Sequence, residues 1–133
     1  MRIIGWEAAL NAAVARHRAL PFDWGVSDCF MFPLDGIVAV IGRDPWPGMH
    51  DYDSRLGATR CLMAQGYASV ADAFAGVFRE INPVFAQRGD VGVLMNDGAL
   101  CGALFTSRGF EGKAERGLVS FPRAIVTRAF RVE

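Results

Sequence analysis

The sequence predicts an α+β fold, with helices before Pro83 and an antiparallel sheet after it. Before Pro83 the apolar residues recur every three or four positions, which is the period of an amphipathic helix. After it they lie in short extended runs separated by glycine and proline, a pattern typical of strands. The 133 residues are 52% apolar and include ten phenylalanines, enough to bury a sizeable core. We therefore expect one domain over residues 1–133, with N-terminal helices packed on a C-terminal sheet.

The helical part contains four segments that place apolar side chains on one face. Their expected ranges are Trp6–Arg18, Asp28–Ile41, Ser54–Gln65 and Val70–Phe78. The second segment is the most apolar and should form the central buried helix, ending at Gly42. Pro33 lies inside it. Because proline disrupts a helix beyond the first turn, this helix should either start late or kink.

The extended part opens with a hairpin signal. Two apolar runs flank Asn96-Asp97-Gly98, and an Asp-Gly pair favours a tight turn between antiparallel strands. Further strands are expected where short apolar runs lie between glycine or proline residues. The expected strand ranges are Val91–Met95, Ala99–Phe105, Phe110–Lys113, Leu118–Phe121 and Ala129–Val132.

The charge balance and hydropathy exclude two classes of partner. Lysine plus arginine and aspartate plus glutamate both number 14, so no strongly basic field exists to attract nucleic acid. The longest apolar run, Phe30–Ile41, is too short to span a bilayer. The first residues lack the continuous apolar stretch of a signal peptide. We expect synthesis in the cytoplasm, no membrane span and no nucleic-acid partner.

No cofactor is expected. The three cysteines, Cys29, Cys61 and Cys101, are widely spaced, and neither they nor the two histidines form a local pair of metal ligands. The same spacing gives no sign of a disulfide framework. No glycine-rich phosphate-binding motif is present.

The segment Phe22–Cys29 carries the strongest chemical signal. Cys29 opens the central helix, where unpaired N–H groups and the helix dipole favour a reactive thiolate. Asp28 beside it suits a helix cap, and Asp90 suits a residue that fixes the start of a strand by hydrogen-bonding to backbone. A free cysteine is also commonly buried as a small apolar residue. Cys29 is therefore either a nucleophile or a structural residue.

Four short motifs together resemble the core of NlpC-type papain-like cysteine peptidases. They are Trp24-Gly25, Asp28-Cys29, Arg88-Gly89-Asp90-Val91 and Cys101-Gly102-Ala103. The resemblance implies a papain-like α+β core with Cys29 in the place of the nucleophile. In that superfamily a His-x-Gly tripeptide on the following strand supplies the base.

The chain departs from this pattern at the base. Aligning Gly102 with the glycine of the tripeptide puts Leu100 where the histidine would stand, and no histidine follows His50. Leucine cannot take or return a proton, so peptide hydrolysis should be lost. His17 continues an apolar helix face and should have its nitrogens satisfied locally. His50 lies in a turn, and a dyad between it and Cys29 is left open as an alternative.

A second resemblance covers nearly the whole chain. The segments Pro21–Cys29, Tyr52 with Ser54, Ala86–Val91 and Arg116–Leu118 are similar to a small family encoded among the tail genes of siphophages and prophages. This resemblance implies a structural or assembly component of a phage tail, in the tail-tip region, on a peptidase scaffold that has lost its chemistry. Its place would be the virion tail, and its partners other tail proteins.

Two other functions stay open at this point. One is an active cysteine peptidase or amidase that acts on cell-wall peptides, with peptidoglycan peptide as substrate and Cys29 as nucleophile. The other is a prophage-encoded module that binds a host protein. Three aromatic residues, Trp24, Trp46 and Tyr52, are expected to anchor a protein interface, because aromatic side chains are enriched at such contacts.

Overall fold

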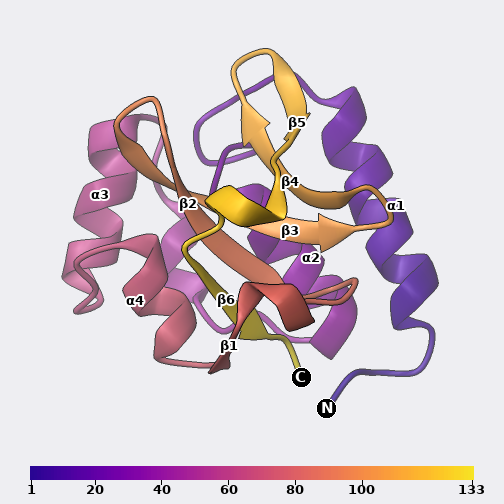
Figure 1. Cartoon of the computed structure of the whole chain (residues 1–133). Coiled ribbons are helices and arrows are strands. Elements are labelled where there is room, and N and C mark those ends of the chain that lie inside the picture. The colour runs from indigo at the N-terminus through magenta and orange to yellow at the C-terminus, as the bar shows by residue number, and fades with distance from the viewer.

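A computed structural model describes all 133 residues and has an α+β architecture (Figure 1). Its helices are α1 (Trp6–Ala19), α2 (Met31–Ile41), α3 (Arg55–Ala64) and α4 (Val70–Ala75). Its strands are β1 (Arg79–Ile81), β2 (Val91–Asn96), β3 (Ala99–Thr106), β4 (Gly109–Ala114), β5 (Gly117–Ser120) and β6 (Arg128–Arg131). All strands pair antiparallel in one sheet of order β1-β6-β2-β3-β4-β5. The expected fold class is thus confirmed at the level of α+β.

All the expected helices and strands are present, and the structure adds one strand that was not expected. All four helices lie where the apolar period placed them, and the turn at Asp97-Gly98 has the positive φ angles of a tight hairpin turn. Strand β1 was not predicted. Its residues, Arg-Glu-Ile, are largely exposed and too few to show an alternating pattern. It exists because it pairs with β6, a contact with a strand about fifty residues further along the chain.

Helix α2 starts late, as the position of Pro33 suggested. Its first helical residue is Met31, so Pro33 falls in the first turn, where backbone N–H groups have no intrahelical partner. The Asp28 side chain caps this end by accepting hydrogen bonds from the N–H groups of Phe30 and Met31. Proline therefore costs this helix no hydrogen bond.

The core lies between α2 and the sheet. Strand β3 runs against α2 closely enough that a Cβ on Gly36 would stand 2.5 Å from the Leu104 side chain. Strand β2 contributes Val91 and Val93 to the same core, while β3 and β4 are the strands that run closest to α2. Figure 1 shows α3 and α4 at one side of the sheet and α1 at the other.

Trp46 belongs to this core, which corrects its expected role as a surface anchor. Only 1% of it is exposed, and its ring contacts those of Phe30, Phe74 and Phe78. The loop folds inward with the help of the Asp44 carboxylate, which accepts a hydrogen bond from the backbone N–H of Trp46 at 2.7 Å. Burying so large an apolar surface outweighs leaving the indole N–H, which has no partner, out of water.

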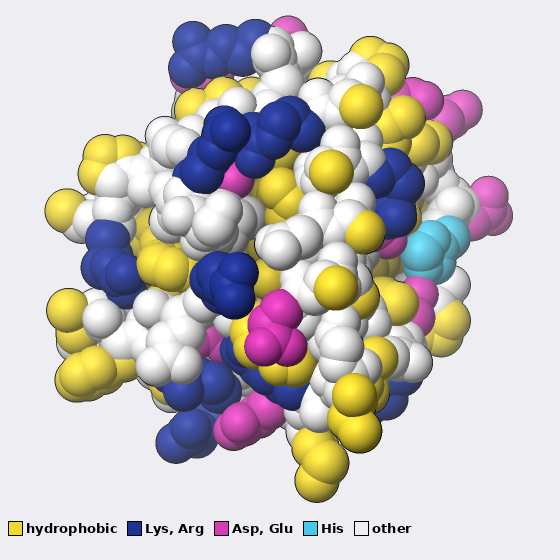
Figure 2. Space-filling model, turned by 90° about the vertical axis from the view of Figure 1, so that its right-hand side faces the viewer, with side chains coloured by type: hydrophobic (Ala, Val, Ile, Leu, Met, Phe, Trp, Pro, Cys, Tyr) yellow, Lys and Arg dark blue, Asp and Glu magenta, His cyan; other side chains and the backbone are white.

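One face of the molecule agrees with the neutral composition. Figure 2 shows basic and acidic side chains scattered among hydrophobic ones on the face to the right of Figure 1, with no single basic patch. None of the helices combines the length and the hydropathy needed to cross a bilayer.

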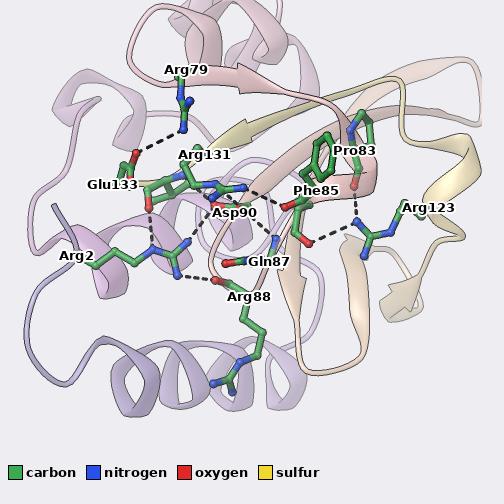
Figure 3. Close-up of polar contacts among 12 residues, drawn as sticks. Arg2, Arg79, Pro83, Phe85, Gln87, Arg88, Asp90, Arg123, Arg131 and Glu133 are labelled. Atoms are coloured by element: carbon green, nitrogen blue, oxygen red, sulfur yellow. Dashed lines mark hydrogen bonds and ion pairs between the residues drawn. The ribbon is translucent and has the colours of Figure 1, made fainter.

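A buried carboxylate joins the two ends of the chain (Figure 3). Asp90, at the start of β2, is fully buried and accepts hydrogen bonds from the N–H groups of Gln87 and Val132. The Arg2 guanidinium lies 3.0 Å from its Oδ1, and Arg131 Nε makes an ion-pair contact with its Oδ2 at 3.2 Å. Arg2 also donates to the carbonyl of Val132. The N-terminal segment is thereby fixed to the last strand.

We expect Asp90→Asn to lower the free energy of unfolding by about 3–5 kcal/mol, because breaking a buried ion pair leaves two guanidinium groups without their counter-charge. Urea denaturation of both proteins measures this difference. Glu80→Gln is the matched control, since its pair with Arg128 lies on the surface and should contribute less than about 1 kcal/mol. Equal effects of the two substitutions would contradict a central role for Asp90.

Candidate functional site

A cleft of about 790 Å³ opens between α3, the loop that precedes α2, and one end of the sheet. Its volume lies in the range of small-ligand and peptide sites. Most lining residues are apolar. Among the charged ones, Asp28 and Lys113 are buried, whereas Arg55, Asp97, Glu115 and Arg116 are exposed at the rim. Its lining includes Trp24, Cys29, Tyr52, Leu62, Leu100 and Arg116.

Cys29 lies in the turn immediately before α2 and is half-buried in the cleft. The backbone of β3 passes directly against it. A Cβ on Gly102 would stand 2.6 Å from the Cys29 carbonyl oxygen, closer than real side-chain atoms approach, so only glycine fits this point of the strand. The Gly102 N–H also donates a hydrogen bond to the Cys29 sulfur. The thiol is thus held between the helix start and the strand.

Asp28 fixes the backbone around this thiol. Its fully buried carboxylate accepts hydrogen bonds from the N–H groups of Gly25, Phe30 and Met31 and from the Tyr52 hydroxyl at 2.7 Å. Burial, and then the charge of Asp28 together with this hydrogen bond, raise the pKa of the Tyr52 phenol far above its ordinary value. Tyr52 therefore acts here as a neutral donor. Both residues line the cleft, and each oxygen of the Asp28 carboxylate already accepts two hydrogen bonds from these donors.

The residue that faces Cys29 from β3 is Cys101. Its thiol lies beside the Cys29 sulfur, and its hydrogen has two acceptors within reach, this sulfur and the Gly102 carbonyl oxygen at 3.3 Å. The hydrogen bond from Cys101 lowers the pKa of Cys29, although burial and the charge of Asp28 oppose it. The same contact, with burial, raises the pKa of Cys101.

Leu100, expected at the position of the base, also lines the cleft. Its side chain packs against the main core, and it offers Cys29 no polar atom. Cys101, the next residue of the strand, is largely buried. Its contact with a second thiol was missed, because no local spacing connects two cysteines so far apart in the chain.

Neither histidine is hydrogen-bonded to Cys29 as a base would be. His17 is fully buried, with Nδ1 at 2.7 Å from Ser27 Oγ and Nε2 at 2.6 Å from Asp35 Oδ2. Its nitrogens are satisfied as expected, here by side chains of the α2 region. His50 is exposed and pairs with Asp44 at 2.5 Å. The hydrogen-bond partners of both imidazoles are thus Ser27, Asp35 and Asp44, and not the Cys29 thiol.

The Ser27–His17–Asp35 chain has the residue types of a serine nucleophile with its base and its orienting acid. It is a structural pin and not a catalytic unit, because Ser27 is fully buried and does not line the cleft. Burial alone would raise the pKa of Asp35, but hydrogen bonds and charge from His17 and Arg16 outweigh it and lower the pKa. These hydrogen bonds between Ser27, His17 and Asp35 join α1 to the turn that carries Cys29.

Lys113 is a further polar residue of the cleft that the sequence did not indicate. Its ammonium group reaches from β4 to the carbonyl oxygens of His17 and Leu20, each at 2.5 Å. Burial lowers its pKa. It thus satisfies the C-terminal end of α1, a role without any local sequence signal because the partners lie 93 and 96 residues away.

The sequence-predicted site residues therefore separate into three places. Cys29, Asp28, Trp24 and Tyr52 meet at the cleft, Asp90 lies at the chain ends, and Trp46 lies in the core. The cleft brings together a thiol pair, aromatic side chains and charged rim residues. It contains no group of three metal-ligating residues. Such an arrangement can bind a ligand and hold a thiolate.

We expect Gly102→Ala to destabilise the protein by about 1–3 kcal/mol, because the added methyl group must displace either β3 or the Cys29 turn. Gly48→Ala is the matched control. Its Cβ would meet only the flexible end of Gln65 at 3.2 Å, so a change below about 1 kcal/mol is expected. Thermal or urea unfolding measures both. A Gly102→Ala protein as stable as the control would contradict the close contact of β3 with Cys29.

The chain was also compared with known proteins. Over residues 1–132 it matches the family described as Domain of unknown function (DUF6950). No curated protein and no solved structure matches it. Because the family match spans nearly all of the fold described above, including every residue of the cleft, the chain belongs to the DUF6950 family.

Proposed function

We propose that this protein is a structural or assembly component of a phage or prophage tail, built on a papain-like NlpC-type scaffold that no longer hydrolyses peptides. One observation carries the loss of activity: the Cys29 thiol faces a second thiol, while both imidazoles of the chain are engaged elsewhere. The tail assignment is supported by the resemblance of four sequence segments to proteins encoded among tail genes.

Three features support the papain-like scaffold. Cys29 stands at the start of the central helix α2, and a strand carrying the Cys101-Gly102 pair passes against it. Arg88-Gly89-Asp90 leads into the first strand of that hairpin. These positions agree with the motif order of NlpC-type peptidases.

The missing base accounts for inactivity. A thiol peptidase needs a group that removes the thiol proton and then, as its conjugate acid, protonates the departing amine. Cys101 cannot do the second step well, because a thiol whose pKa is raised gives up its proton reluctantly. Removing a member of such a catalytic unit typically costs about a million-fold in rate.

The cleft supports a role in binding. Trp24 and Tyr52 add aromatic surface to its lining, and the charged residues of the lining include Arg55 and Arg116 beside the acidic Asp97 and Glu115. A peptide segment of another tail protein suits such a groove, because aromatic and arginine side chains are the usual anchors of protein contacts. Trp46 has no part in this contact, since it lies in the core.

An active cysteine hydrolase of cell-wall peptides is the second candidate. It is favoured by one observation, the lowered pKa of Cys29 in a cleft that substrate could enter. This function requires a proton donor for the leaving group, which substrate itself would have to supply.

Peptide hydrolysis decides between the two. Incubated with peptidoglycan stem peptides, the wild-type protein should release no more product than Cys29→Ala, because no base activates the thiol. Mass spectrometry of the peptides measures this, with an NlpC-type peptidase as the positive control. Product that depends on Cys29 would overturn the proposal in favour of the hydrolase.

Binding to tail proteins tests the proposed role as a tail component. We expect co-expression with the tail proteins encoded beside it to give a complex in size-exclusion chromatography. Trp24→Ala should weaken that complex about tenfold or more, because loss of a central aromatic anchor typically has this effect. Phe85→Ala is the matched control, since this side chain is 66% exposed and lies outside the cleft. Equal affinities of the two variants, or no complex with any tail protein, would contradict the proposal.

A further inference from the structure

We propose that Cys29 and Cys101 form a dithiol site, which a low-molecular-weight disulfide oxidises to an intramolecular disulfide on the floor of the cleft. The inference does not depend on the proposed function, because it concerns only the two thiols and their access. Both cysteines are free in the structure.

The backbone geometry brings these residues together from distant parts of the chain. The Gly102 N–H, adjacent to Cys101, donates to the Cys29 sulfur, and the Gly102 Cα approaches the Cys29 carbonyl so closely that no side chain fits. Both thiols line the same cleft. A disulfide needs Cα atoms within about 7 Å and side chains that point toward each other. A hydrogen bond between the two thiols, which line one cleft, agrees with the second condition.

The two thiols are not equivalent. Cys29 is half-buried and reaches the cleft, whereas Cys101 is only 6% exposed. The pKa of Cys29 is lowered and that of Cys101 is raised by their mutual hydrogen bond. Cys29 is therefore the thiol that a disulfide reagent meets first, and as the more ionised one it is the better attacking group.

The reaction is a two-step exchange. The Cys29 thiolate, having lost its proton to solvent, attacks one sulfur of the reagent R–S–S–R, forming Cys29–S–S–R and releasing one RS⁻. Cys101 then gives up its proton and attacks the Cys29 sulfur, which forms the Cys29–Cys101 disulfide and releases the second RS⁻. Both thiolates leave as RSH after taking up a proton. The two protein thiols are oxidised, and the reagent is reduced by two electrons.

The third cysteine provides an internal control. Cys61 lies on α3, where its thiol contacts the Asp51 carbonyl oxygen at 3.6 Å, and it does not line the cleft. It has no thiol partner. Cys61→Ser should therefore leave the dithiol chemistry unchanged.

The test treats the reduced full-length protein with oxidised glutathione and reads intact mass and tryptic peptides. Wild type and Cys61→Ser should lose two hydrogen atoms and give a linked peptide pair containing Cys29 and Cys101. Cys101→Ser should instead keep one glutathione on Cys29, because no second thiol can resolve the mixed disulfide. Cys29→Ser should leave Cys101 unmodified. Circular dichroism confirms that each variant is folded.

Three results would overturn the inference. In the first, the wild-type protein keeps both thiols reduced and Cys101→Ser also stays unmodified. In the second, the wild-type protein stops at a glutathione adduct on Cys29. In the third, the linked peptide pair contains Cys61. None of these bears on peptide hydrolysis or on tail binding. A failure here is therefore distinguishable from a failure of the proposed function.

Discussion

The buried carboxylate of Asp28 is the interaction on which the cleft depends. An ionised group without water is tolerated only when hydrogen bonds replace its hydration, and four donors surround this one. Three of them are backbone N–H groups, so satisfying the carboxylate fixes the path of the chain through the turn and sets where α2 begins. The fourth is Tyr52, from beyond α2, which thereby becomes a wall of the cleft. Because Cys29 lies in this turn, the same hydrogen bonds fix its position.

Asp90 repeats the same principle at the far end of the molecule. It too is fully buried at the start of a secondary-structure element and accepts from backbone N–H groups, but its remaining partners are the two guanidinium groups of Arg2 and Arg131. The two carboxylates therefore differ in function. Asp28 organises a local turn beside a thiol, whereas Asp90 joins segments that are 88 residues apart.

Local patterns predicted most of the fold, and contacts between distant segments account for what they missed. The start of α2 followed from Pro33, and the β2–β3 hairpin from its Asp-Gly turn. Trp46 was expected at a protein interface because aromatic side chains are enriched there, yet the aromatic cluster that it packs against comes from α4 and the turn before α2. The pairing of Cys101 with Cys29 is likewise visible only in three dimensions. Leu100 was identified as a residue without chemistry, but the neighbouring thiol was not.

The order of the strands has a consequence for the growing polypeptide. Strand β6 follows the other five strands along the chain, yet it lies between β1 and β2, so these two strands have no common neighbour until β6 has been synthesised. The Val132 N–H that Asp90 needs emerges from the ribosome later still. Helices and the β2–β3 hairpin can form while translation continues, since their contacts are local. The six-stranded sheet, and with it the hydrogen bond from Arg2 to the Val132 carbonyl, is completed only after residues 128–132 have been synthesised.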